Sequence, residues 1–165
     1  MTEQSFSAEE FSQAVRSAIA DRAVLLALLV REMSASHPEI DFASVVRRAT
    51  FALGRRRGEQ AGAADSPEAF ARNSNSPAGT LAFEQELVEA DRARMVKLFH
   101  RCPLVDAWRG IGASDAEVAL LCSLASPFDQ GVISASPTLS LRFSETLGEG
   151  GHTCTMIVEP QKSSD

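Results

Sequence analysis

Apolar residues recur at helical spacing near the N-terminus of the chain. Ser7 and Glu10 have the spacing of a capping box, which marks the start of a helix. The apolar positions behind it are Phe11, Val15, Ile19, Leu26, Leu29 and Met33. From Val24 to Val30 the helix is apolar nearly all round, a pattern typical of a helix buried on every side. We therefore expect the middle of this helix to be central to the core.

A second helix is predicted after Asp41, because aspartate is a preferred residue at helix N-termini. Its apolar stripe consists of Phe42, Val45, Val46, Ala49 and Leu53. The arginines that fall mostly off this stripe are Arg47, Arg48 and Arg55 to Arg57. They could bind a carboxylate substrate, since arginine pairs with carboxylates through two parallel hydrogen bonds. A solvated helix face is the preferred interpretation, because cations suit a helix C-terminus.

Residues 58–79 are small and polar and are interrupted by Pro67 and Pro77. We expect a long loop with a short helical turn at residues 67–72, and such a loop could cover a pocket.

Residues 80–101 fit two different structures. Glutamate, leucine, arginine and lysine dominate the segment, which favours a charged helix. Yet Val96, Leu98, His100 and Cys102 share one face if the chain is extended, and residues 91–93 could form the turn of a hairpin. The residues alone leave this choice open.

The remaining pattern alternates short helices with strands. Helices are predicted at residues 104–111 and from Ser114 to just before Pro127. Strands are predicted at residues 139–143 and 152–158, joined through a glycine-rich turn. We expect a single α+β domain over residues 1–165, with N-terminal helices packed on one antiparallel sheet of about four strands. Its parts are a helical region at 7–57, the loop at 58–79, and a half at 80–160 that bears the candidate site.

Composition narrows the class of protein. The chain has 165 residues, of which 44% are hydrophobic and 23% charged, as in ordinary globular proteins. A net charge of −6 argues against binding to nucleic acid, and the apolar run at 23–30 is too short to cross a membrane. Three widely spaced cysteines predict reduced thiols in the cytoplasm rather than a disulfide framework. The apolar surplus of the first helix is compatible with a homodimer.

Most of the reactive side chains lie between Phe99 and Val158. This segment holds His100, Cys102, Trp108, Cys122, Asp129, His152 and Cys154. It contains no P-loop, no nucleophile elbow and no Cys-x-x-Cys pair. Structural zinc sites draw ligands in close pairs, which these cysteines do not form. We therefore predict neither a metal site nor a cofactor.

Each candidate also has a structural interpretation. Cys122 lies near the C-terminal end of its predicted helix, where the dipole opposes a thiolate, so it is either an inert buried thiol or a nucleophile beside a cation. Cys102 fits a strand end, and Cys154 fits the core face of the last strand. Asp129 is predicted in a loop, as a turn former or as a general base. His100 could relay a proton if it shares the face of Cys102.

The order of these residues resembles the L-2-amino-thiazoline-4-carboxylic acid hydrolase family. Members carry Cys-Pro before a helix, a cysteine followed shortly by an aspartate, and a C-terminal hairpin ending in Gly-x-x-x-Cys. The matching elements here are Cys102-Pro103, Cys122 with Asp129, and Gly150 to Cys154. The match covers the C-terminal half well and the helical half only in general character. Many relatives have a second cysteine just before the aspartate, where this chain has Ser126.

The resemblance implies a hydrolase that opens a cyclic amidine in a small carboxylate such as 2-amino-thiazoline-4-carboxylate, in cysteine metabolism or specialised biosynthesis. It also favours two antiparallel strands within residues 80–101. A weaker resemblance, to small-molecule-binding domains related to vinyl reductases, rests on architecture only.

That chemistry needs a base, a proton donor and a cation for the carboxylate. The implied catalytic residues are Asp129, Cys122, His100 and Cys102, and the implied substrate-binding residues are Arg101, Arg109, Trp108 and Ser126. Asp129 would activate water, and one of the two arginines would bind the carboxylate. Ser126 in place of a family cysteine keeps a second hypothesis open, a non-catalytic sensor or interaction domain that binds a small molecule.

Overall fold

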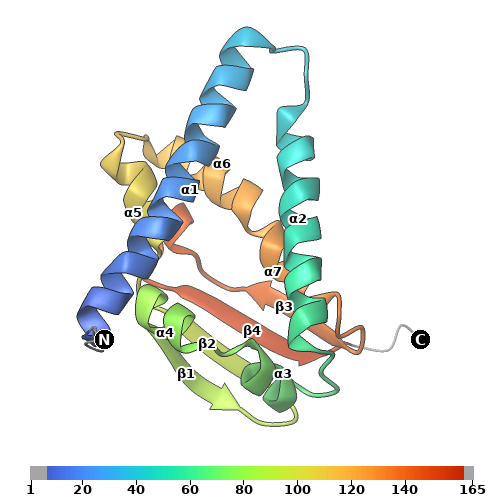
Figure 1. Cartoon of the computed structure of the whole chain (residues 1–165). Helices are drawn as coiled ribbons and strands as arrows, with labels where there is room; N and C mark the ends of the chain where they lie inside the picture. Colours follow the sequence, from blue (N-terminus) through green and yellow to red (C-terminus); the bar gives the residue numbers. More distant parts are fainter. Residues whose placement is uncertain (1–6, 162–165) are drawn as a thin grey trace, which may run out of the picture.

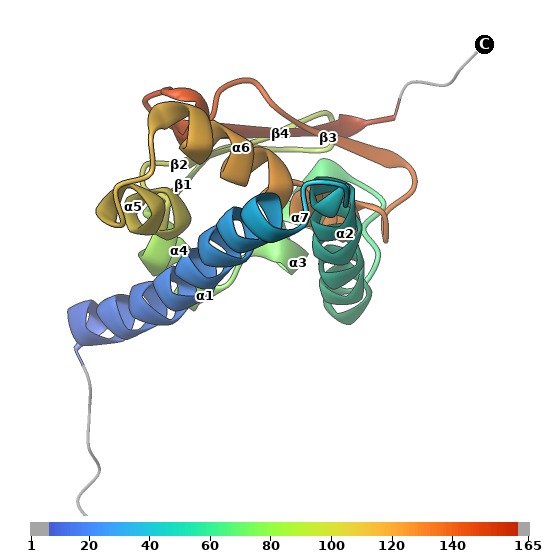
Figure 2. The ribbon, with the colours of Figure 1, turned by 90° about the horizontal axis from the view of Figure 1, so that it is seen from above.

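The chain forms three layers, which are seen from above in Figure 2. A computed structural model describes residues 7–161. A sheet forms one outer layer, and α5 (Pro103–Gly110), α6 (Asp115–Ala125) and α7 (Pro127–Ile133) lie against it. The long helices α1 (Ala8–Ser36) and α2 (Phe42–Ala61) lie on the side away from the sheet, as the two limbs of a V (Figure 1).

The sheet is antiparallel and has the strand order β1-β2-β4-β3. Its strands are β1 (Gln85–Ala90), β2 (Met95–Phe99), β3 (Leu139–Phe143) and β4 (Cys154–Pro160). The predicted α+β class with four strands is therefore confirmed, and so is the β-hairpin in residues 80–101. Only residues 80–83 of that segment are helical instead.

Two short helices replace most of the loop predicted at residues 58–79. They are α3 (Pro67–Ser74) and α4 (Pro77–Phe83), and α2 extends to Ala61. Each short helix starts with the same signal, a serine that caps the helix followed by a proline. Ser66 accepts a hydrogen bond from the N–H of Ala69, and Ser76 accepts one from that of Gly79. Proline suits the first helical position because the missing N–H has no partner there anyway.

Helix α2 packs on α7 through glycines rather than through its predicted apolar stripe. A Cβ atom on Gly54 would collide with the backbone oxygen of Phe128, and one on Gly58 would collide with that of Val132. This close approach of two backbones turns most of the predicted stripe outward. Of its members, Val46 is buried, whereas Val45, Ala49 and Leu53 are exposed.

Helix α1 is buried on one side only, contrary to the expectation for its middle segment. Ala23 and Ala27 are buried, and the carbonyl of Ala23 accepts a hydrogen bond of 2.8 Å from the indole of Trp108. On the other side Leu25 is 57% exposed and Leu28 is 50% exposed. Within residues 7–161, no helix combines the length and the apolarity needed to cross a membrane.

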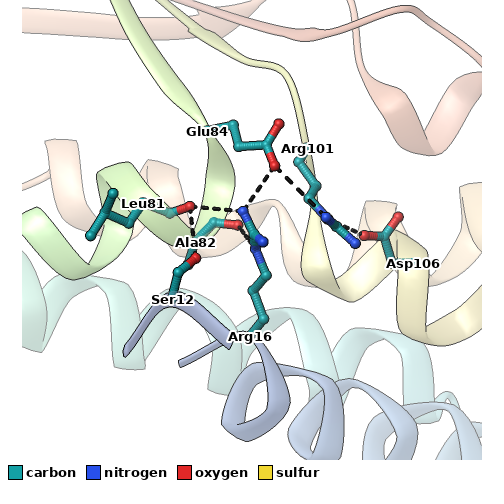
Figure 3. Close-up of polar contacts among 7 residues, drawn as sticks. All are labelled: Ser12, Arg16, Leu81, Ala82, Glu84, Arg101 and Asp106. Carbon is teal, nitrogen blue, oxygen red and sulfur yellow. Dashed lines mark hydrogen bonds and ion pairs between the residues drawn. The ribbon is translucent and has the colours of Figure 1, made fainter. Parts of the chain in front are cut away.

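A polar network joins the first half of α1 to the end of α4 (Figure 3). Arg16 donates hydrogen bonds of 3.0 Å to the carbonyls of Leu81 and Ala82 and pairs with Glu84 at 2.8 Å. Arg101 lies next to the same glutamate, at 3.7 Å. The network fixes the chain where it leaves α4 and enters the sheet.

Two buried apolar clusters lie on either side of the middle layer. The first joins α3 and α7 to the helix-facing side of the sheet, with Phe70, Met95, Leu141 and Val158 among its members. The second joins α1, α5 and α6, with Trp108, Val118 and Leu121 among its members. Of the candidate side chains, Trp108 belongs to the second cluster, and Cys102 and Cys122 pack against it.

Candidate active site

Cys102 and Cys122 belong to neighbouring helices. Cys102 is the residue before α5, where Pro103 starts the helix, and Cys122 is in the last turns of α6, as predicted. Both side chains are partly buried and pack against the apolar cluster that contains Trp108. The indole itself is only 1% exposed. Trp108 is therefore a core residue that supports the two thiols from behind.

Cys154 approaches from the sheet. It begins β4 opposite Phe99, and its sulfur accepts a hydrogen bond of 3.3 Å from the N–H of Leu147. The short 3-10 helix η1 (Leu147–Glu149) that bears this donor packs on α6. A Cβ on Gly148 would lie 2.5 Å from both Cβ and Sγ of Cys122, so only glycine fits. One segment thus contacts the thiols of both Cys122 and Cys154.

Asp129 lies in the first turn of α7, and not in a loop as predicted. Burial raises the pKa of its carboxyl from 3.8 to about 7, and a hydrogen bond from its own N–H lowers it slightly. No ion pair involves this carboxyl within residues 7–161. A carboxyl with a pKa near neutrality has the affinity for a proton that a general base needs.

The electrostatic coupling of these groups shows that they converge. Burial is the main cause that raises the pKa of Cys122 to about 11, and the charges of Cys102, Glu149 and Asp129 contribute in the same direction. Burial also raises the pKa of Cys154, and the charges of Cys122 and Asp129 act in the same direction. The three cysteines and Asp129 therefore form one cluster, which we call the thiol–Asp129 cluster.

The thiols of this cluster are poor nucleophiles as they stand. Burial raises the pKa of Cys102 to about 11, although the nearby N–H groups of Val105 and Leu104 act to lower it. A pKa of about 11 leaves roughly one thiolate per ten thousand molecules at pH 7. Asp129 is the group of the cluster whose protonation changes near neutral pH.

Three predicted polar partners lie on the protein surface instead. His100 is exposed and its Nε2 lies 2.8 Å from the carboxylate of Glu86. It continues the face of β2 that points away from the helices, whereas Cys102 returns to the helix side. Arg101 bonds to Asp106 at 2.7 Å (Figure 3), and exposed Arg109 donates to the carbonyl of Leu147. The structure does not bring these three residues into the thiol–Asp129 cluster.

Lys97 is a cation that the sequence reading missed. It pairs with Met156 in the sheet, so strand alternation places it on the same helix-facing side as Cys154. Its side chain is only 4% exposed, and burial lowers the pKa of its ammonium group. Within residues 7–161 the ammonium makes no hydrogen bond or ion pair. The one signal in the sequence was a single charge within the apolar strand Met95–Phe99.

Ser126 occupies the junction of α6 and α7 and is exposed. Its backbone carbonyl accepts a hydrogen bond of 3.1 Å from the N–H of Asp129. The residue therefore helps to form the first turn of α7. Within residues 7–161, no three histidine, cysteine, aspartate or glutamate side chains are arranged to hold a metal ion.

Comparison with known families decides what kind of chain carries this cluster. The model of the family described as L-2-amino-thiazoline-4-carboxylic acid hydrolase matches residues 16–158. The chain belongs to this family. The hydrolase-family match begins within α1 and ends in β4, so it covers most of the chain and includes the helical half more fully than the sequence motifs indicated.

The hydrolase family is the only functional statement that the comparisons support. No curated protein matches the chain. Nothing in the comparisons supports the architectural resemblance to vinyl-reductase-related domains.

Proposed function

We propose that this member of the hydrolase family opens the ring of a cyclic amidine that also carries a carboxylate, with 2-amino-thiazoline-4-carboxylate as the reference substrate. The observation that supports the proposal is the position of Asp129. In a chain of this family, it is a partly buried carboxyl whose pKa burial raises to about 7, and its charge acts on Cys122 and Cys154. The carboxylate form can pair with a protonated amidine before the reaction.

The reaction consumes one water molecule and needs no oxidant or reductant. Asp129 accepts a proton from water while the water oxygen bonds to C2 of the ring. The electron pair of the C=N bond moves to nitrogen, which gives a tetrahedral centre. That centre collapses by breaking the C2–S bond: the proton passes from Asp129 to the leaving sulfur, the remaining hydroxyl proton is released to water as the C=O bond forms, and the ring opens to N-carbamoyl-cysteine. The thiols of Cys102 and Cys122 stay neutral and exclude water around the base.

Lys97 is the group that would bind the substrate carboxylate. Diagonal neighbours on antiparallel strands lie roughly 7–8 Å apart, and Lys97 and Cys154 are such neighbours. A lysine side chain can cover that distance. Burial lowers the pKa of Lys97, and its ammonium has no anionic partner within residues 7–161, so a bound carboxylate would stabilise its charged form. A substrate with one cation and one anion would then satisfy Asp129 and Lys97 together.

Turnover of 2-amino-thiazoline-4-carboxylate by the purified protein tests the proposal. Asp129→Asn should lower kcat by about 10²–10⁴-fold, as loss of a general base does, while the fold is retained. Asp106→Asn is the matched control, because Asp106 is an exposed surface carboxylate that pairs with Arg101. Full activity of the Asp129→Asn protein would refute the assignment of the base.

The role of Lys97 has a separate kinetic signature. Lys97→Met should raise KM by about 10- to 100-fold, the value of a charge-assisted hydrogen bond, with a smaller effect on kcat. Arg109→Met is the control and should change KM by no more than about twofold, because that arginine is exposed. The reverse result would place the carboxylate at the surface, near Arg109.

Binding without catalysis is the second candidate function. The raised pKa values of all three thiols favour it, because no thiolate nucleophile is prepared. Calorimetric titration of the same compound distinguishes the two functions. Binding with no product after prolonged incubation supports a sensor, whereas product formation supports the hydrolase. The three free thiols suit a reducing compartment, and we propose the cytoplasm.

A further inference from the structure

The outer side of α1 carries an apolar surface that nothing in the described chain covers. Leu25, Leu28 and Leu29 project from consecutive turns and are 57%, 50% and 46% exposed. Figure 2 places α1 on the side of the molecule away from the sheet. A helix that is apolar all round is normally buried on every side, and a contiguous exposed apolar surface marks an interface. We call these three leucines the α1 leucine surface.

Charged residues at both ends of this surface are self-complementary. Arg22 precedes the leucines by one turn and Glu32 follows them by one turn, and both are exposed. Neither side chain forms an ion pair within residues 7–161. The arginine Nε donates only to the carbonyl of Ala18, and the glutamate accepts only from the hydroxyl of Ser36. Both charges are therefore available to a partner.

We propose that a second copy of this chain covers the α1 leucine surface, with the two α1 helices antiparallel about a twofold axis. In such a pair, a residue of one helix faces a residue of the other when the two are equally far, on opposite sides along the sequence, from the position where the axis crosses α1. Leu25 and Leu29 have their midpoint at residue 27, and Arg22 and Glu32 have the same midpoint. One register thus places each Leu25 on the partner's Leu29 and each Arg22 beside the partner's Glu32.

The same register suits the other residues of this side. Leu28 lies one residue from the centre of this register, beside the axis. The remaining exposed charge of the segment, Asp21, faces Met33 of the second copy rather than another acid. A helix of 29 residues is about 44 Å long, so the contact can extend well beyond the leucines. A standard interface buries about 800 Å² on each partner.

Sedimentation equilibrium of the full chain tests the proposal, first with the unmodified protein and then with a charge swap. The protein should be a dimer at micromolar concentration. Arg22→Glu and Glu32→Arg should each weaken the dimer by about tenfold or more, because each change places two like-charged pairs across the axis. The double variant R22E/E32R should return to within about threefold of the parent, since it restores both pairs in reverse.

Val88→Glu is the matched control, because Val88 is 56% exposed but lies on β1, far from α1 in the chain. It should leave the dimer unchanged, whereas Leu28→Glu should abolish it. Circular dichroism would show that every variant keeps its helices. A parent protein that remains monomeric at about 100 μM would overturn the proposal. Single charge variants that dimerise like the parent, or a double variant that fails to recover, would overturn it as well.

Discussion

Asp129 should make the protein less stable as the pH rises through the neutral range. In the unfolded chain its carboxyl releases its proton near the ordinary pKa of 3.8, whereas the folded protein holds the proton up to a pKa of about 7. Between these values the unfolded state binds fewer protons, so the free energy of unfolding falls with rising pH. Below about pH 4 the carboxyl is protonated in both states, so its titration does not change the free energy of unfolding. Above about pH 7 it is ionised in both states, and the loss of stability is complete.

The size of this loss follows from the two pKa values. A rise from 3.8 to about 7 corresponds to roughly 4 kcal/mol of lost stability once the buried carboxyl is ionised. Asp129→Asn keeps the shape of the side chain and removes the titration. The variant and the parent should therefore be equally stable at pH 4, and the variant should be more stable by up to about 4 kcal/mol at pH 8.

Urea unfolding between pH 4 and pH 8 measures this difference. Trp108 is the sole tryptophan and is 1% exposed, so its fluorescence reports the loss of the core. Asp106→Asn is the control and should follow the parent at every pH, because that carboxylate is exposed. A difference between Asp129→Asn and the parent that stays constant from pH 4 to pH 8 would contradict the reasoning.

Three further substitutions test the packing around the site. Gly148→Ala should lower the free energy of unfolding by about 1–3 kcal/mol in urea titrations, because its methyl group would collide with Cys122. Gly110→Ala is the control and should not lower it, because the space around Gly110 is open. Gly54→Ala should lower the free energy of unfolding by at least as much, because its methyl group would push α7 away from α2. The shift would move the carboxyl of Asp129, so kcat should fall as well. An unchanged kcat would show that α7 tolerates the shift. Lys97→Met should raise the melting temperature, with a gain of about 1–2 kcal/mol in the free energy of unfolding, because it removes a charged side chain that is buried without a partner within the described residues. A lower melting temperature would indicate that an anion is bound in the free protein.

Local signals in the sequence predicted much of the fold. Ser7, Asp41 and Ser114 each cap a helix at the expected place, and their side chains accept the expected backbone hydrogen bonds. The alternation in residues 139–143 identified β3, and the glycine turn identified the return to β4. These features depend on neighbours in the chain, so periodicity and capping rules suffice to find them.

The errors concern contacts between distant segments. The apolar stripe of α2 was expected to face the core, but the spacing of Gly54 and Gly58 lets the backbone of α7 approach more closely than any apolar side chain could. The helical turn predicted at residues 67–72 is confirmed by α3, but Pro77 was interpreted as part of a loop, although the pair Ser76-Pro77 starts a helix. In both cases small residues have a structural role that hydrophobicity does not reveal.

The same limit applies to the candidate site. The chain order placed Cys102, Cys122 and Asp129 in one segment, and the structure brings them together with Cys154. The position of Lys97 on the helix-facing side could not be predicted, because strand alternation alone does not say which face of β2 the helices cover. Val96 and Leu98 suggested one face, and that choice selected His100 and passed over Lys97.

Under the proposed function, Asp129 and Lys97 together would determine the kind of ligand that the protein binds. Asp129 comes from the helix layer and Lys97 from the sheet, and neither has an ion-pair partner within the described residues. Burial raises the pKa of the first and lowers that of the second, so each favours the neutral form until an opposite charge arrives. A neutral ligand would satisfy neither group, and a simple anion would satisfy only the lysine. A compound with a cationic amidine at one end and a carboxylate at the other would satisfy both, and each interaction would strengthen as water leaves the site. The cost in stability of the two free charges is then the reason to expect binding energy from this class of substrate.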